Sequence, residues 1–297
     1  SLLAEGEEKR DGDNGGQKKE VKNRKTNTEK NSITRKRTLK SKKSPMCLAC
    51  EKGHLNIMKL LYDNGAQDDI HEAIVYACRH NHVDILQWLI NNKASFEMAP
   101  PEMAPPPHQQ FPLFSNDALL SKKKSLTPMM TACKYGHLDI MQCLGSNGAS
   151  EKEIREISKG TTEMTPLLYA IENGHLSCVQ WLYENGARAD IRKGRKGRKE
   201  LAQRTTSMHL ACIHGHLNIA QYLFDHGCAM DIHVKREHNE TLMFDICSDV
   251  YRGDVNPVPI LRWLVAKGAS NQLREPDSFG KTPLYCACEN DQLETIQ

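Results

Sequence analysis

The feature that most constrains the fold of this chain is a segment of about 24 residues that recurs along it. The clearest copies share a Thr at the start, a central Gly-His pair and a closing Gly. Six copies and the start of a seventh occupy residues 44–67, 72–95, 127–150, 165–188, 206–229, 240–270 and 277–297. One such unit is too short to bury its own apolar side chains, so neighbouring units must stack.

Each conserved position of the unit has a physical role in a pair of helices. Ser44, Thr127, Thr165, Thr206, Thr241 and Thr282 are suited to cap the first helix. Pro follows at residues 45, 128, 166 and 283, where the missing N–H costs nothing. Gly53, Gly136, Gly174 and Gly215 are placed to end that helix. Gly65, Gly148, Gly186, Gly227 and Gly268 are placed to close the second helix. The pattern predicts an all-α fold.

These motifs resemble the ankyrin repeat, whose T-P-L-H-x-A opening, central G-H and closing L-x-x-x-G-A recur here at fixed spacing. The resemblance implies an elongated, curved solenoid of helix-turn-helix repeats with hairpin-like loops, over residues 44–297. The second copy departs most, because Asn81 and Lys93 replace its two glycines. Its capping position is expected at Glu72. The sixth copy carries extra residues between its helices, near 251–259.

Three segments fall outside the repeat pattern. Residues 1–43 lack apolar periodicity and are predicted to be a disordered basic tail, since residues 1–45 carry 14 Lys and Arg against 7 Asp and Glu. A Pro-rich insert, about 96–126, is predicted to be a disordered loop. A basic insert, about 191–204, contains Arg192, Lys193, Arg195, Lys196, Arg198 and Lys199. These six residues are candidate contacts for an anion or for nuclear import, or else form a solvated loop tip.

The sequence contains few candidates for a catalytic or metal-binding site. Cys47-x-x-Cys50 with His54 has some of the spacing of a zinc site. However, the second Cys recurs in register at 78, 133, 212, 247 and 288, where most copies lack another ligand, so a buried packing role is expected. The recurring His residues at 54, 82, 137, 175 and 216 are expected to bridge neighbouring loops by hydrogen bonds. We therefore expect no enzyme activity, no cofactor and no metal.

Composition indicates the cellular compartment in which the protein is expected. The mean hydropathy is −0.60 and no apolar run approaches about 18 residues, so no membrane span is expected. Eleven cysteines without a secretory signal are typical of an intracellular protein, cytoplasmic or nuclear. The chain opens without Met and stops within the seventh copy, so it is expected to be a fragment.

The predicted function is a non-enzymatic scaffold or adaptor that binds a protein partner on its concave face, and the chain is expected to be a monomer. By the resemblance, the contact positions are Leu126, Lys134, Tyr135, Met164, Glu172, Asn173, Thr205, Ile213, His214, Lys281, Glu289 and Asn290. Tyr135 and Ile213 are the expected anchors, because aromatic and apolar side chains dominate interface energetics. Two alternatives remain open: a regulatory or substrate-recruiting part of a larger kinase or ubiquitin ligase, and a nucleic-acid-associated nuclear protein acting through the basic segments.

Overall fold

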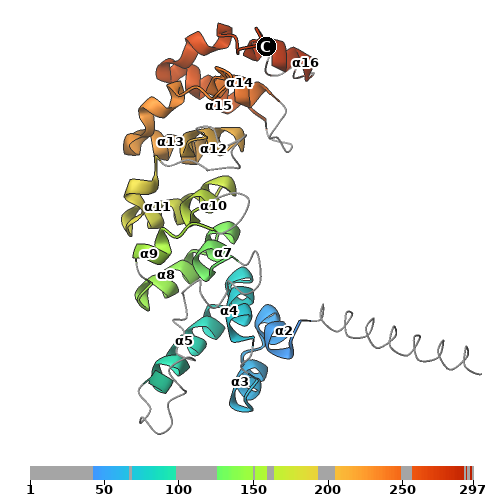
Figure 1. Ribbon diagram of the computed structural model, residues 1–297, viewed down its shortest axis with the longest axis vertical. Helices are drawn as coiled ribbons and strands as arrows, with labels where there is room; N and C mark the ends of the chain where they lie inside the picture. The colour runs from blue at the N-terminus through green and yellow to red at the C-terminus, as the bar shows by residue number, and fades with distance from the viewer. Residues whose placement is uncertain are drawn as a thin grey trace, which may run out of the picture. The chain divides into compact units, whose positions relative to one another are not determined.

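The computed structural model describes residues 43–66, 69–97, 126–149, 151–158, 164–192, 205–248, 256–290, 292 and 295. Every regular element in these ranges is a helix, which confirms the predicted all-α class (Figure 1). The chain divides into two units, Ser1–Ser44 and Pro45–Gln297. The predicted tail, apart from Lys43, lies outside the described residues, as do nearly all of the Pro-rich insert and the basic insert beyond Arg192.

Within the second unit the helices come in pairs, as the repeats predict. The first helices of the pairs are α2 (Pro45–Lys52), α4 (Ile70–Arg79), α7 (Pro128–Tyr135), α10 (Pro166–Glu172), α12 (Ser207–Ile213), α14 (Leu242–Cys247) and α16 (Pro283–Glu289). The second helices are α3 (Leu55–Asp63), α5 (Val83–Glu97), α8 (Leu138–Ser146), α11 (Leu176–Glu184), α13 (Leu217–Leu223) and α15 (Val258–Leu264). Short helical turns follow several pairs: α9 (Glu151–Ile154), η2 (Ala187–Asp190), η3 (Phe224–Cys228), η4 (Ala229–His233), η6 (Val265–Ala269) and η7 (Ser270–Arg274).

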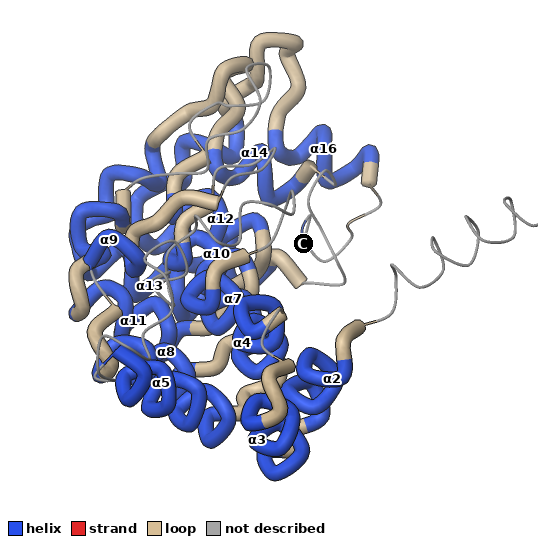
Figure 2. Tube along the Cα trace, turned by 60° about the horizontal axis from the view of Figure 1, so that its bottom comes forward, coloured by secondary structure: helices blue, strands red, loops and turns tan. Residues whose placement is uncertain are grey.

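The helices form two layers because each first helix packs on the first helix of the next repeat. Contacts link α2 to α4, α4 to α7, α7 to α10, and so on to α16, while α3, α5, α8, α11 and α13 form the second layer (Figure 2). The aliphatic and sulfur-bearing residues between the layers are buried, among them Met58, Leu86, Met141 and Leu182. None of the helices in the described ranges has the length and apolar character needed to cross a bilayer.

The predicted capping residues start the first helices. The Thr127 hydroxyl accepts a hydrogen bond from the Met130 N–H at 3.2 Å. Equivalent bonds to the N–H three residues later are made by Thr165, Thr206, Thr241 and Thr282. Each bond satisfies one of the N–H groups that a helix leaves unpaired in its first turn.

The second repeat shows how the missing glycines change the local structure. Asn81 takes the left-handed conformation, with φ 59°, that Gly adopts at this position in other repeats. Asn is one of the few residues that tolerate it. At Lys93 no glycine ends the second helix, and α5 continues to Glu97 over 15 residues. The capping position expected at Glu72 was wrong: Asp69 occupies it, and α4 begins at Ile70.

The cysteine column is a packing feature, as predicted, with one exception. Cys50, Cys78, Cys133, Cys212 and Cys247 are buried, and burial raises the pKa of Cys50 to about 12. A thiol with such a pKa remains protonated at neutral pH and is a poor metal ligand. The prediction was wrong for Cys288, which is exposed, because nothing in the described part of the seventh repeat covers that side of α16.

Buried charges tie successive repeats together. The guanidinium of Arg155 forms a two-pronged bond with the buried Asp190 carboxylate, at 2.8 and 3.2 Å. In the next repeat Arg192 contacts the buried Asp231 at 3.4 Å. Asp190 and Asp231 occupy the same position in their repeats, four residues after the closing Gly.

A third ionic cluster joins the loop before the sixth repeat to the first helix of that repeat. The Arg236 guanidinium lies 2.9 Å from Oδ1 of the buried Asp245 and 3.6 Å from Glu240. Oδ2 of Asp245 is also buried and has no hydrogen-bond partner among the described residues. Burial raises the pKa of the Asp245 carboxyl to about 7, an effect that Arg236 opposes and Glu240 supports. The guanidinium of Arg236 is therefore the partner of two carboxylates, those of Asp245 and Glu240, in a region with little access to water.

Candidate functional site

The recurring histidines join the ends of the first helices into one surface. The Nε2 atoms of four of these five rings lie within hydrogen-bond distance of a backbone carbonyl of the preceding repeat. The pairs are His82 with Glu51 at 3.1 Å, His137 with Arg79 at 2.8 Å, His175 with Lys134 at 3.2 Å and His216 with Glu172 at 3.1 Å. This confirms the predicted bridges for His82, His137, His175 and His216, whereas His54, in the first repeat, makes no such bond among the described residues. The carbonyl partners are the last or next-to-last residues of α2, α4, α7 and α10.

The central glycines leave room for these rings. A Cβ atom on Gly136 would lie 2.5 Å from the His175 ring, and one on Gly174 would lie 2.7 Å from the His216 ring. Gly53 stands in the same relation to His82. These glycines also have positive φ, 74° to 79°, so two separate constraints demand glycine here.

The helix ends present a continuous row of side chains, which we call the helix-end strip. It consists of Lys52, Arg79, His80, Lys134, Tyr135, Glu172, Asn173 and His214. All eight are exposed or half-buried, and they differ in charge and size from repeat to repeat. Three of the rings stack on the His of their own repeat, at centroid distances of 6.2 to 6.3 Å: His80 on His82, Tyr135 on His137 and His214 on His216.

Tyr135 is the best-fixed side chain of the strip. Its hydroxyl accepts a hydrogen bond from Nε of Arg79, at 2.9 Å, across 56 residues of sequence. The Arg79 guanidinium also lies over the ring, 5.2 Å from its centroid, and Lys134 Nζ lies 5.9 Å from it. A ring face attracts cations at such distances. Tyr135 is thus half-buried and held between two repeats.

The structure corrects two of the predicted contact residues. Ile213 and Met164 were expected on an exposed surface, but they are only 6% and 2% exposed. Ile213 is the last residue of α12, a helix whose seven residues are all buried, so it packs inward. Met164 immediately precedes the Thr165 cap, and its N–H donates to the Ser158 hydroxyl. Neither side chain is available as an anchor.

The remaining predicted residues are spread over several repeats. Leu126 and Thr205 are half-buried, just before the caps of α7 and α12. In the seventh repeat Lys281 forms an exposed ion pair with Glu289 at 3.0 Å, and the Asn290 amide donates to the Cys247 carbonyl at 3.1 Å. The structure therefore brings Lys134 and Tyr135 together with Arg79, while Lys281, Glu289 and Asn290 form a separate group.

The basic insert contributes one described residue, and that residue has a structural partner. Arg192 is exposed but contacts the Asp231 carboxylate of the next repeat. It was predicted to contact an anion or an import receptor, and its charge is instead paired within the chain. Lys193, Arg195, Lys196, Arg198 and Lys199 lie outside the described residues.

Sequence reasoning missed an exposed aromatic residue in the seventh repeat, Phe279. Phe279 is 74% exposed in the loop between η7 and α16. The loop is well defined, because one carboxylate oxygen of Asp277 accepts the N–H groups of Phe279 and Lys281 at 2.9 and 2.8 Å. A backbone bond from Ser278 to His238, at 2.7 Å, joins it to the preceding loop. The sequence Asp-Ser-Phe-Gly at residues 277–280 is typical of a turn, and it could have indicated that Phe279 is exposed.

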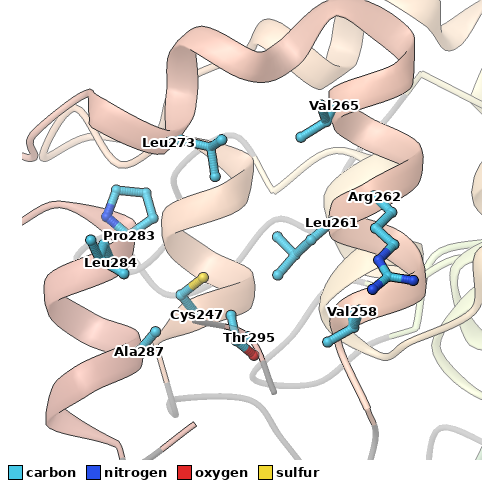
Figure 3. Close-up of a pocket in the computed structure, with 10 residues that line it drawn as sticks. All are labelled: Cys247, Val258, Leu261, Arg262, Val265, Leu273, Pro283, Leu284, Ala287 and Thr295. Atoms are coloured by element: carbon cyan, nitrogen blue, oxygen red, sulfur yellow. The ribbon is translucent and has the colours of Figure 1, made fainter. Parts of the chain in front are cut away.

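A cavity of about 300 Å³ lies between α14, α15 and α16 (Figure 3). Its described lining is Cys247, Val258, Leu261, Arg262, Val265, Leu273, Pro283, Leu284, Ala287 and Thr295. Most of these side chains are apolar, and no carboxylate or imidazole is among them. The cavity can therefore accept apolar groups but offers no general acid or base from these residues.

Comparisons with known proteins agree with this architecture. A family model described as ankyrin repeats, in three copies, matches residues 18–99, 110–195 and 163–236, which is more than half of the chain. A putative ankyrin repeat protein of Acanthamoeba polyphaga mimivirus is 31% identical over 125 residues, covering 41% of this chain. The matched part spans 18% of that longer protein.

One solved structure supports the fold directly. The ankyrin repeat domain of human ASB11 has a TM-score of 0.53 and 19% sequence identity. The likeness covers 82% of this chain and 92% of that one. At this identity the likeness concerns the fold alone.

Proposed function

Because this chain belongs to the ankyrin-repeat family, whose repeats form protein–protein interaction domains, we propose that it binds a protein partner through the helix-end strip, with Tyr135 at the centre. The strip joins side chains from five repeats on a backbone fixed by the His bridges. A rigid backbone with variable side chains is what selective recognition requires, since little conformational entropy is lost on binding.

The observation that carries the proposal is the arrangement around Tyr135. A half-buried Tyr supplies a large contact area with few rotamers to freeze, and here its position is already fixed by Arg79 and His137. Around it lie Lys134, Glu172 and Asn173, which can form the polar rim of an interface. We assign these repeats no catalytic step, and their role is to hold a partner.

We expect Tyr135→Ala to weaken binding by tenfold or more, about 1.4 kcal/mol, because it removes a central aromatic contact. The test selects binders to the full chain from phage-displayed random peptides and measures their affinity for each variant by fluorescence anisotropy. Gln142→Ala is the matched control, since Gln142 is exposed on α8 in the second layer. Tyr135→Phe removes only the hydroxyl bond to Arg79 and should keep most of the affinity.

The unfolding transition provides the second readout. Tyr135→Ala should lower the free energy of unfolding by only about 1 kcal/mol, the cost of losing the hydrogen bond to Arg79, so that the variant remains folded in the binding assay. If the selected peptides bind Tyr135→Ala as tightly as the parent, or if Gln142→Ala is the variant that loses them, the helix-end strip is not the binding surface.

A further inference from the structure

Charge is distributed unevenly along the helix-end strip. The first three repeats contribute the cations Lys52, Arg79 and Lys134, and the fourth contributes Glu172. The acidic residue of the first repeat, Glu51, has a side chain only 15% exposed and lies 3.9 Å from Lys52. The accessible charge over the ends of α2, α4 and α7 is therefore positive.

The three cations lie on adjacent helix ends. His82 bonds the carbonyl of Glu51, next to Lys52, and His137 bonds the carbonyl of Arg79. Arg79 in turn reaches Tyr135 on the third repeat, beside Lys134. A ligand that follows the row from the first repeat to the third would meet each cation in turn.

Arg79 is placed to recognise a carboxylate. Its side chain is exposed, and its Nε is committed to the Tyr135 hydroxyl at 2.9 Å. That bond, and the position of the guanidinium carbon 5.2 Å from the ring centroid, hold the Arg79 head group beside Tyr135. A planar guanidinium binds a carboxylate by two parallel hydrogen bonds, and a side chain that is already held in place loses less entropy when it does so.

We propose that the strip over the first three repeats binds an acidic peptide segment of a partner protein, with a carboxylate on Arg79 and an apolar side chain against Tyr135. This inference rests on the proposed function and specifies its partner. Lys52 and Lys134 attract the acidic segment from either side, an interaction that salt screens. Glu172 sets the boundary, because a second carboxylate beside it would be repelled.

The experiment uses the same phage-displayed peptide selection on the full chain. The selected sequences should be enriched in Asp and Glu, and raising NaCl from about 0.05 M to about 0.5 M should weaken their binding severalfold. Arg79→Ala should cost tenfold or more, and Arg79→Lys should restore only part of this loss. The matched control is Arg188→Ala, because Arg188 also lies over a tyrosine ring, 4.9 Å from that of Tyr183, but outside the strip.

The outcomes separate this inference from the proposed function. If Tyr135→Ala abolishes binding while the peptides lack acidic residues and tolerate Arg79→Ala, the strip binds a partner but the acidic chemistry is wrong. If neither Tyr135→Ala nor Arg79→Ala weakens peptide binding, both the proposed function and the present inference are wrong. A DNA duplex that displaces the peptides at equal charge would show a general polyanion site, and failure to enrich any peptide would also contradict the inference.

Discussion

Gly136→Ala is expected to lower the free energy of unfolding by about 3 kcal/mol, whereas Gly148→Ala lowers it by only about 1 to 2 kcal/mol, the ordinary cost of a left-handed alanine. Both glycines belong to the third repeat and both have positive φ, 75° and 90°. They differ in what a Cβ atom would meet. At Gly136 it would collide with the His175 ring at 2.5 Å, and at Gly148 it would meet nothing within 4 Å.

The additional loss at Gly136 comes from the His bridge. To make room, the His175 ring must leave its place and give up its bond to the Lys134 carbonyl. A lost hydrogen bond costs about 1 kcal/mol, and the displaced ring loses packing as well. Urea unfolding of both variants, followed by circular dichroism, measures the difference. Equal losses would mean that the ring moves freely and that the bridges do not fix the helix ends.

The second large effect concerns the stability of the sixth repeat as the pH changes. Because the pKa of Asp245 is raised to about 7, the folded chain keeps a proton that the unfolded chain releases near pH 4. The unfolded state therefore binds fewer protons between these values, and stability falls as the pH rises. Relative to Asp245→Asn, the parent should lose on the order of 4 kcal/mol as the pH rises from about 4 to about 8, since each pKa unit corresponds to about 1.4 kcal/mol.

The comparison with Asp245→Asn is needed because His209 titrates in the opposite sense. Burial lowers the pKa of His209 to about 4, so its contribution to stability is lost as the pH falls below about 6.5. His209 is present in both proteins, and its effect cancels in the difference. Urea unfolding at several pH values gives that difference. If the free energy of unfolding of the parent instead rises relative to that of Asp245→Asn as the pH rises, Arg236 keeps the Asp245 carboxylate ionised. The pKa of Asp245 would then be lowered and not raised.

The parts of the fold that sequence could predict are those fixed by local chemistry. A Thr followed by Pro indicates the start of a helix, and a Gly before His indicates its end, independently of how the neighbouring repeats pack. The Thr127 cap, the positive φ of Gly136 and the bridge from His137 are therefore as expected. The same register placed Lys134 and Tyr135 at the helix end, since they directly precede Gly136, but Lys52, Arg79 and His80 were not among the predicted contact residues.

The errors concern properties that neighbouring repeats decide. Whether Ile213 points inward depends on how α12 packs between α10 and α14, and no pattern within one repeat encodes that. The partner of Tyr135 was missed for the same reason, because Arg79 lies 56 residues earlier in the most irregular repeat. By contrast, Lys93 in place of the closing Gly indicated that the second helix of this repeat ends irregularly. In the structure, that helix, α5, extends to Glu97.

The most direct test of the helix-end strip is hydrogen exchange of the full chain with and without a saturating selected peptide. The account predicts slower exchange at the ends of α4 and α7 and in the turns that follow, residues 78–82 and 133–137. Exchange in the second helices α8 and α11 should not change. Protection confined to those second helices, or to the apolar cavity between α14, α15 and α16, would contradict the account.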